Sequence, residues 1–192
     1  MAKIGLLGGT FNPIHIGHLI LANYMLEFTY LDEVWFLVTP HNPLKEAESL
    51  LEDNIRLEMT RLAVKDFDRL LVSDIEFDMP KPSYTIETLT KLKAVNPGLE
   101  FTLLIGSDNW TKFPQWKDNE RLTKEFKILI YPRLGEDVLI NGLHTENVRL
   151  VDAPVVEISS TFIRESIRAG KDVRAFLPNR VYDYILSNKL YK

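Results

Sequence analysis

The chain has no cysteine, no excess of positive charge and no long hydrophobic run, and each absence removes a class of protein. Without cysteine there is no disulfide, no thiolate zinc site and no cysteine nucleophile, which is typical of a cytoplasmic protein. The formal net charge of -4 argues against a nucleic-acid partner, because general nucleic-acid binders carry a basic excess. The apolar run after Lys3 is too short for a signal peptide and no later run approaches a membrane span. We therefore expect a soluble chain that begins at Met1 and has no membrane partner.

The sequence indicates one α/β domain over residues 1–192. These residues are 45% hydrophobic and 26% charged, which is enough for a single core, and no linker, low-complexity segment or repeat divides them. Apolar runs alternate with helical patterns, as in a doubly wound parallel sheet with crossover helices. The predicted strands are 3–7, 33–38, 70–73, 101–105, 127–131 and 149–151. The predicted helices are 17–28, 54–67, 85–95, one from Ser159 or Ser160 to Gly170, and a last one with Pro178 in its first turn.

Within the first predicted helix, the apolar stripe comprises Leu19, Ile20, Ala22 and Leu26. Three tyrosines near the C-terminus serve either the core or the interface of a homo-oligomer: Tyr182, Tyr184 and Tyr191.

Unusual polar residues follow the predicted strands. His15 and His18 come after the first strand, and the segments 40–45, 106–110 and 158–164 come after the second, the fourth and the last. In doubly wound folds, ligands bind beyond the carboxyl ends of the strands. The distribution therefore predicts a binding site at that edge of the sheet.

The segment from Gly8 to His18 has the features of a phosphate-binding turn. Its glycines permit a tight turn and close approach of a ligand, and Pro13 fixes one backbone dihedral. The free N–H groups and the positive dipole end of the following helix favour an anion. His15 and His18, three residues apart at the helix start, can turn both rings toward one ligand and act as donors. Either histidine alone would more often be a surface or core residue.

Arg164 points to a second anion contact. It lies in the early turns of its predicted helix, where a cation opposes the helix dipole, and a bound anion would remove that conflict. Ser159 and Thr161 can add hydroxyl donors to the same anion. The alternative is a capped surface helix whose arginine reaches solvent or pairs with Glu157 or Glu165.

These two segments resemble the paired signatures of the nucleotidylyltransferase superfamily. One is Gly-x-Phe-x-Pro-x-His-x-Gly-His from Gly9 to His18, and the other is Ser159-x-Thr161-x-x-Arg164. With Pro-Ser-Tyr-Thr at 82–85, Gly-Ser-Asp at 106–108 and the closing segment 177–191, nearly the whole chain resembles the bacterial nicotinate-nucleotide adenylyltransferases. Asn12 stands where that family more often has Asp. The resemblance implies a Rossmann-like nucleotidylyltransferase fold.

The resemblance also implies a reaction, in which the adenylyl group of ATP passes to nicotinate mononucleotide with Mg²⁺ bridging ATP phosphates and no protein metal site. It implies catalytic roles for His15, His18, Lys45 and Arg164. Other contacts to ATP would come from Gly8, Gly9, Thr10, Phe11, Gly106, Asp108, Ile158, Ser159 and Thr161. Contacts to the acceptor would come from Thr85, Tyr84 and Trp116. Packing roles for Tyr84 and Trp116 stay open at this point, and Trp35 is expected in the core.

Other functions account for fewer of these residues. A class I aminoacyl-tRNA synthetase shares His-Ile-Gly-His but needs a longer chain and a lysine-rich second signature. A dinucleotide-binding oxidoreductase needs Gly-x-Gly-x-x-Gly after the first strand. A metal hydrolase built on His15, His18 and His41 lacks an obvious carboxylate. The remaining alternatives are an adenylyltransferase that acts on phosphopantetheine or nicotinamide mononucleotide, and a nucleotide sensor without turnover.

Overall fold

The computed structural model describes residues 1–40, 50–135 and 146–192, and places six strands in one parallel sheet. The order across the sheet is β3-β2-β1-β4-β5-β6, and every neighbouring pair is parallel. This is the order of a doubly wound Rossmann-type sheet, as the sequence predicted. The strands are β1 (Ala2–Gly9), β2 (Glu33–Val38), β3 (Leu70–Ser73), β4 (Leu99–Gly106), β5 (Lys127–Tyr131) and β6 (Val148–Leu150).

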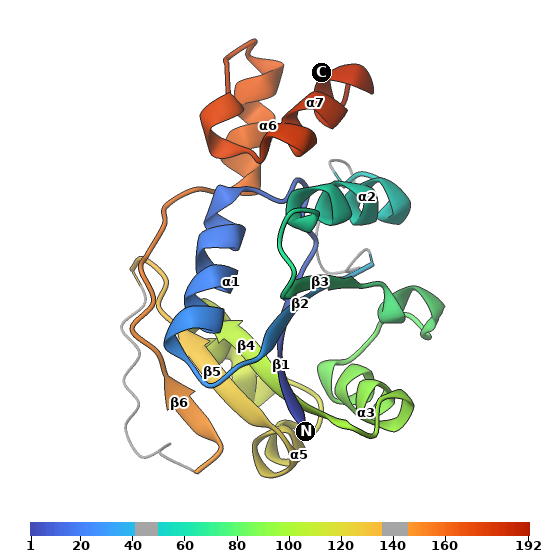
Figure 1. The fold of residues 1–192 in the computed structure, drawn as a ribbon, viewed down its shortest axis with the longest axis vertical. Coiled ribbons are helices and arrows are strands. Elements are labelled where there is room, and N and C mark those ends of the chain that lie inside the picture. Colours follow the sequence, from blue (N-terminus) through green and yellow to red (C-terminus); the bar gives the residue numbers. More distant parts are fainter. Residues whose placement is uncertain (41–49, 136–145) are drawn as a thin grey trace.

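Helices cover both faces of the sheet (Figure 1). The α-helices are α1 (Ile16–Phe28), α2 (Asp53–Val64), α3 (Thr85–Val95), α4 (Ser107–Lys112), α5 (Asn119–Glu125), α6 (Ser160–Arg168) and α7 (Asn179–Ser187). The short 3-10 turns are η2 (Ile75–Asp78), η3 (Phe113–Gln115) and η4 (Arg174–Phe176). No helix in these described ranges is long and apolar enough to span a bilayer.

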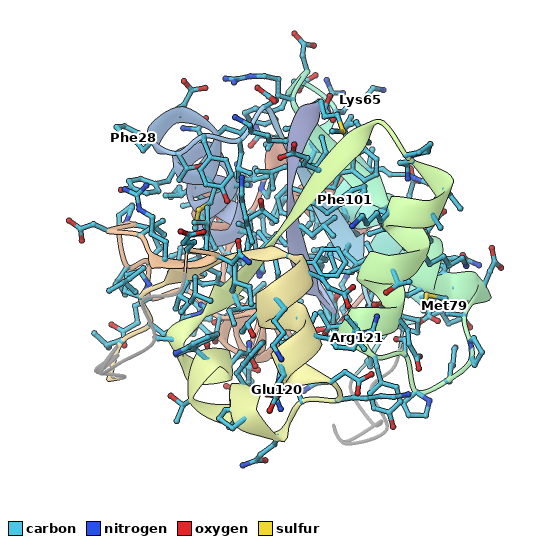
Figure 2. The ribbon with its side chains drawn as sticks, turned by 90° about the horizontal axis from the view of Figure 1, so that it is seen from below. Phe28, Lys65, Met79, Phe101, Glu120 and Arg121 are labelled. Atoms are coloured by element: carbon cyan, nitrogen blue, oxygen red, sulfur yellow. The ribbon has the colours of Figure 1, made fainter. Side chains whose placement is uncertain are left out.

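Two hydrophobic clusters lie on opposite faces of the sheet. One joins α1, α2, α6 and α7 to the sheet through side chains such as Met25 and Ile163, and the other joins α3, α4 and α5 through side chains such as Leu89 and Leu122. In the view from below, Glu120 and Arg121 mark α5, on the other side of the sheet from α1, which ends at Phe28 (Figure 2). A sheet buried on both faces explains why its strands are continuous apolar runs.

The predicted strands 33–38, 70–73 and 127–131 and the predicted helix 85–95 match the structure residue for residue, whereas α4 and α5 were not predicted. These two helices have six and seven residues, too few for a periodic pattern. The predicted stripe on α1 is wrong at Ile20, which is 38% exposed, while Leu21 and Met25 are buried. Because α1 is apolar on nearly all sides, periodicity could not select the buried face.

The sheet order places a crevice between β1 and β4. The chain leaves these adjacent strands in opposite directions, toward helices on opposite faces, and such a switch point is where ligands bind in this architecture. The carboxyl ends of the strands lie at the end of the sheet where α6 and α7 also sit (Figure 1). The N-terminal and C-terminal parts of the chain therefore meet there.

Candidate active site

The turn after β1 is built around the buried ring of Phe11. Phe11 is 3% exposed and adopts a positive φ of 45°, which is uncommon for a residue other than glycine. Its ring lies edge-on to His18, with centroids 5.1 Å apart, and to Phe36 of β2. A Cβ on Gly9 would come within 2.9 Å of the Phe11 ring, so this position requires glycine. The predicted phosphate turn is thus held in place by aromatic packing beneath it.

The two histidines of the motif lie together at the start of α1. Their ring centroids are 3.8 Å apart, and the main-chain N–H of His15 donates to Nδ1 of His18 at 3.2 Å. A Cβ on Gly17 would come within 3.1 Å of the His15 ring. Gly17 is one of the glycines expected to permit close approach of a ligand, and in the structure it makes room for this imidazole.

Both imidazoles are neutral near pH 7. Burial, followed by the charge of Arg133, lowers the pKa of His15 from 6.5 to about 4. The pKa of His18 is well below 6.5, chiefly through burial and then through His15 and Arg133. Because Nδ1 of His18 accepts the N–H of His15, the proton of the neutral ring is on Nε2. His18 is therefore a fixed hydrogen-bond donor through Nε2.

Helix α6 brings Arg164 to the same turn. Its Nη1 donates to the carbonyl oxygen of Asn12 at 2.9 Å and its Nη2 donates to the Thr161 hydroxyl at 3.3 Å. No ion pair joins Arg164 to Glu157 or Glu165, all of which the structure describes, so the surface ion pair considered above is wrong.

The first turn of α6 is fastened to the phosphate turn and capped. The Ser160 hydroxyl donates to the Pro13 carbonyl oxygen at 2.8 Å. The Ser159 hydroxyl accepts the N–H of Phe162 at 3.1 Å, as expected for an N-cap residue. Ile158, just before the cap, is partly buried against the core. The two predicted phosphate segments are therefore one continuous surface.

A C-terminal tyrosine, whose role the sequence left open, supports this surface from below. Tyr191 is 8% exposed, and its hydroxyl donates to Oδ1 of Asn12 at 2.8 Å. Burial raises the pKa of this hydroxyl, so it remains a donor at ordinary pH. Tyr191 thus belongs to the core, and its hydroxyl supplies a hydrogen-bond donor to Asn12. Tyr182 and Tyr184 are partly buried against the same core.

Arg56 of α2 is a structural residue of the site that sequence reasoning missed. Its side chain is fully buried, and its guanidinium donates to the carbonyl oxygens of Thr10, Thr39 and Leu51 and pairs with Asp53. Arginine is almost never fully buried unless it is paired in this way. The spacing of apolar residues on α2 could not reveal it, because a charged residue is normally assigned to the solvent face.

The loop after β4 adds a carboxylate and a second arginine. A Cβ on Gly106 would lie 2.3 Å from Oδ1 of Asp108, so a larger residue there would require this carboxylate to move. Arg133, which follows β5, has its Nε 3.8 Å from the same oxygen and stacks over Tyr131 at 5.2 Å. Sequence reasoning missed Arg133. Its position after a predicted strand was the available signal, because the other polar residues of the site follow strands too.

A cavity of about 260 Å³ opens beside the phosphate turn. Its walls include Gly8, Gly9 and Thr10 from the turn, and Thr85 and Trp116 from the predicted acceptor side. Tyr84, in contrast, is 40% exposed and does not line this cavity; its ring lies under Lys117, with Nζ 4.4 Å from the ring centroid. Trp116 also packs against Phe113, with ring centroids 5.4 Å apart, so it both lines the cavity and contacts the hydrophobic core. Trp35 is only partly buried at the edge of the core.

Three buried side-chain atoms in the described part of the chain have no hydrogen-bond partner, and all three belong to this region. They are Nδ1 of His15, Oδ1 of Asp108 and Nε of Arg164. Buried polar atoms are nearly always paired in folded proteins, so these three atoms call for a polar partner such as water, an ion or a ligand. The predicted residues Lys45 and His41 lie outside the described residues. Within the described ones, no three metal-binding side chains gather.

This chain is similar to known proteins over most of its length. A family model described as cytidylyltransferase-like matches residues 6–166. A protein of Bacteroides fragilis named "Probable nicotinate-nucleotide adenylyltransferase" is 54% identical over 184 residues, which is 96% of this chain and 91% of the relative. A protein of the same name from Flavobacterium johnsoniae is 48% identical over 191 residues and covers 99% of both chains.

Solved structures show the same fold. The Plasmodium falciparum nicotinic acid mononucleotide adenylyltransferase complexed with NaAD superposes with a TM-score of 0.81 over all of this chain and 98% of that one, at 20% identity. The same enzyme complexed with APC gives a TM-score of 0.78. At that identity the likeness speaks for the fold alone, while the bacterial relatives speak for the family. This chain belongs to the cytidylyltransferase-like superfamily and, within it, to the nicotinate-nucleotide adenylyltransferases.

Proposed function

We propose that this chain transfers the adenylyl group of ATP to nicotinate mononucleotide, giving nicotinate adenine dinucleotide and pyrophosphate in NAD biosynthesis. A phosphate oxygen of the mononucleotide attacks the α-phosphorus of ATP in line. The bond from that phosphorus to the bridging oxygen breaks, and pyrophosphate leaves with the electron pair. The protein supplies no nucleophile, so catalysis consists of positioning and charge stabilisation.

One observation carries the proposal: three buried atoms without hydrogen-bond partners, from three separate segments, surround one switch point of the sheet. The guanidinium of Arg164 and the imidazole of His15 suit phosphate oxygens. The carboxylate oxygen of Asp108 is an acceptor and suits a ribose hydroxyl, with Gly106 allowing close approach. A nucleotide provides both kinds of partner in one molecule.

The geometry of the turn supports the following residue roles. His18, with its proton fixed on Nε2, donates to the oxygens of the reacting α-phosphate, where negative charge develops. His15 and the turn from Gly8 to Phe11 hold the neighbouring phosphates. Arg164, with the hydroxyls of Ser159 and Thr161, holds the far end of the triphosphate, and the main chain of Ile158 lies at the same surface. Lys45, outside the described residues, would neutralise charge near the reacting phosphates.

The acceptor lies in the cavity beside the turn. Trp116 offers an aromatic face against which the nicotinate ring stacks, and Thr85 at the first position of α3 offers hydrogen-bond donors. Tyr84 contributes its main chain to this helix start, because its side chain lies outside the cavity.

Mg²⁺ enters as part of the substrate. It would bridge the β- and γ-phosphates of ATP and be held by the nucleotide and by water. The side chains that gather at the phosphate turn are imidazoles and a guanidinium, which suit phosphate oxygens, whereas Mg²⁺ prefers oxygen ligands.

The absence of cysteine suits a protein that works in the reducing cytoplasm.

The experiment is magnesium-dependent release of pyrophosphate from ATP with nicotinate mononucleotide, nicotinamide mononucleotide and phosphopantetheine offered separately. Release with the nicotinate form alone is the expected result. Equal release with the amide would broaden the acceptor, and release with phosphopantetheine alone would overturn the assignment. ATP binding with no release from any acceptor would favour a sensor.

A further inference from the structure

Glu76 is a buried residue whose carboxylate lies in the wall of the cavity. No step of the proposed reaction uses this carboxylate. Glu76 lies on η2, just after β3, and is 4% exposed. No ion pair involves Glu76 in the part of the chain that the structure describes. A buried glutamate without a cation is rare, because removing a carboxylate from water is costly. Its hydrogen bonds must therefore account for its presence.

Both carboxylate oxygens accept hydroxyl hydrogens from the segment that begins α3. Oε1 accepts from Thr88 at 2.7 Å, and Oε2 accepts from Ser83 at 3.1 Å. A third link comes from Lys91 on the same helix, whose Nζ donates to the carbonyl oxygen of Ile75 at 3.3 Å. Burial raises the pKa of Glu76, and the two hydroxyl donors act against that rise. Glu76 therefore joins the turn after β3 to both sides of the helix start.

Thr85 lies between these two anchor points. It is the first residue of α3, and together with Glu76 and Thr88 it lines the same cavity as the phosphate turn. Hydrogen bonds to a charged group are stronger and shorter than those between neutral groups, so the carboxylate limits movement of this helix start. A displacement of Thr85 by a fraction of an ångström would weaken the binding of any ligand that it contacts.

We propose that Glu76 is a positioning residue for the acceptor: by holding Ser83 and Thr88 it fixes Thr85 at the wall where the acceptor ring binds. This inference rests on the proposed function, because the acceptor is nicotinate mononucleotide. Glu76 acts through the helix start and makes no contact with ATP, whose predicted contacts lie on the turn after β1, after β4 and on α6. Its loss therefore weakens acceptor binding selectively.

The test uses two variants of similar shape, Glu76→Gln and Thr88→Val, with Thr90→Val as the matched control. Thr90 is two residues further along α3, exposed, and its hydroxyl bonds only to the Ile86 carbonyl oxygen of its own helix. For each variant, KM is measured for nicotinate mononucleotide at saturating ATP and for ATP at saturating mononucleotide, and the melting temperature checks that the variants are folded.

We expect the KM for nicotinate mononucleotide to rise by about tenfold in Glu76→Gln and in Thr88→Val, with the KM for ATP within about twofold of the unmodified chain. Thr90→Val should leave both unchanged. The variant that combines Glu76→Gln with Thr88→Val should raise the acceptor KM no further than the larger single effect, because both changes act on the same hydrogen bond. An unchanged acceptor KM, or equal rises in both KM values, would overturn the role of Glu76.

Failure of the proposed function would look different. In that case the unmodified chain itself would release no pyrophosphate with nicotinate mononucleotide. If Glu76→Gln does not fold, Thr88→Val and Ser83→Ala decide the matter, because each removes one hydroxyl and leaves the carboxylate in place.

Discussion

The main-chain N–H of His15 donates to Nδ1 of His18, and this single bond determines which nitrogen of the second imidazole carries the proton. Nδ1 must be unprotonated to accept, so the neutral ring donates through Nε2. The low pKa of both rings has the same consequence, because a protonated His18 could not accept this bond. The His-x-Gly-His pattern thus provides a neutral donor of fixed orientation.

Two replacements of His18 separate the role of its Nε2 donor from that of the hydrogen bond between its Nδ1 and the main chain of His15. We expect His18→Ala to lower kcat/KM for pyrophosphate release by roughly a hundredfold to a thousandfold, as for loss of a donor to developing charge. His18→Asn keeps an acceptor near the position of Nδ1 and lacks Nε2. It should therefore regain the melting temperature of the unmodified chain and remain as inactive as His18→Ala. Near-normal activity in either variant would remove His18 from the reaction.

The depressed histidine pKa values predict that the fold weakens in mild acid. In the unfolded chain His15 takes up a proton near pH 6.5, whereas in the folded chain its pKa is about 4. Between these values the unfolded state binds more protons, so the free energy of unfolding falls as pH is lowered, by up to about 1.4 kcal/mol per pH unit for this residue. Urea unfolding at several pH values, repeated on His15→Gln, measures the slope. The variant should show a flatter dependence, and parallel curves would contradict the burial argument.

Arg164 should matter for ATP and hardly for the acceptor. We expect Arg164→Ala to raise the KM for ATP by about tenfold or more, because a charge-assisted contact to phosphate is lost. Arg168→Ala, an exposed arginine at the end of the same helix, is the control. Initial rates over a range of ATP concentrations test this, and an unchanged dependence on ATP would count against the assignment.

Tyr191 tests whether the end of the chain supports the phosphate turn. Tyr191→Phe removes the hydroxyl that donates to Asn12 and keeps the ring, so the free energy of unfolding should fall by about 1 kcal/mol. Tyr24→Phe, whose ring stacks on Phe28 at the surface of α1, is the control and should change stability far less. Urea unfolding measures both. Equal effects of the two substitutions would mean that the bond to Asn12 contributes nothing specific.

Sequence patterns predicted the sheet well because its strands are apolar runs buried on both faces. They also predicted that the two histidines lie together at a helix start and that Arg164 lies in the first turns of another helix, because both features depend on spacing along the chain. They missed Arg56 and Glu76, since a charged residue becomes a buried anchor only through carbonyl oxygens or hydroxyls brought close by the fold. The position of the Tyr84 ring was equally unpredictable, because the ring contacts Lys117 from a later segment of the chain.

The phosphate turn is synthesised well before the residues that donate hydrogen bonds to it. Asn12 and Pro13 receive hydrogen bonds from Ser160, Arg164 and Tyr191, and the last of these is 179 residues further on. During translation the histidines and the sheet strands therefore leave the ribosome before these supports, and the turn can gain all three hydrogen bonds only after Tyr191 has emerged. A chain released before α6 would carry the whole histidine motif and lack the three donors that hold the turn.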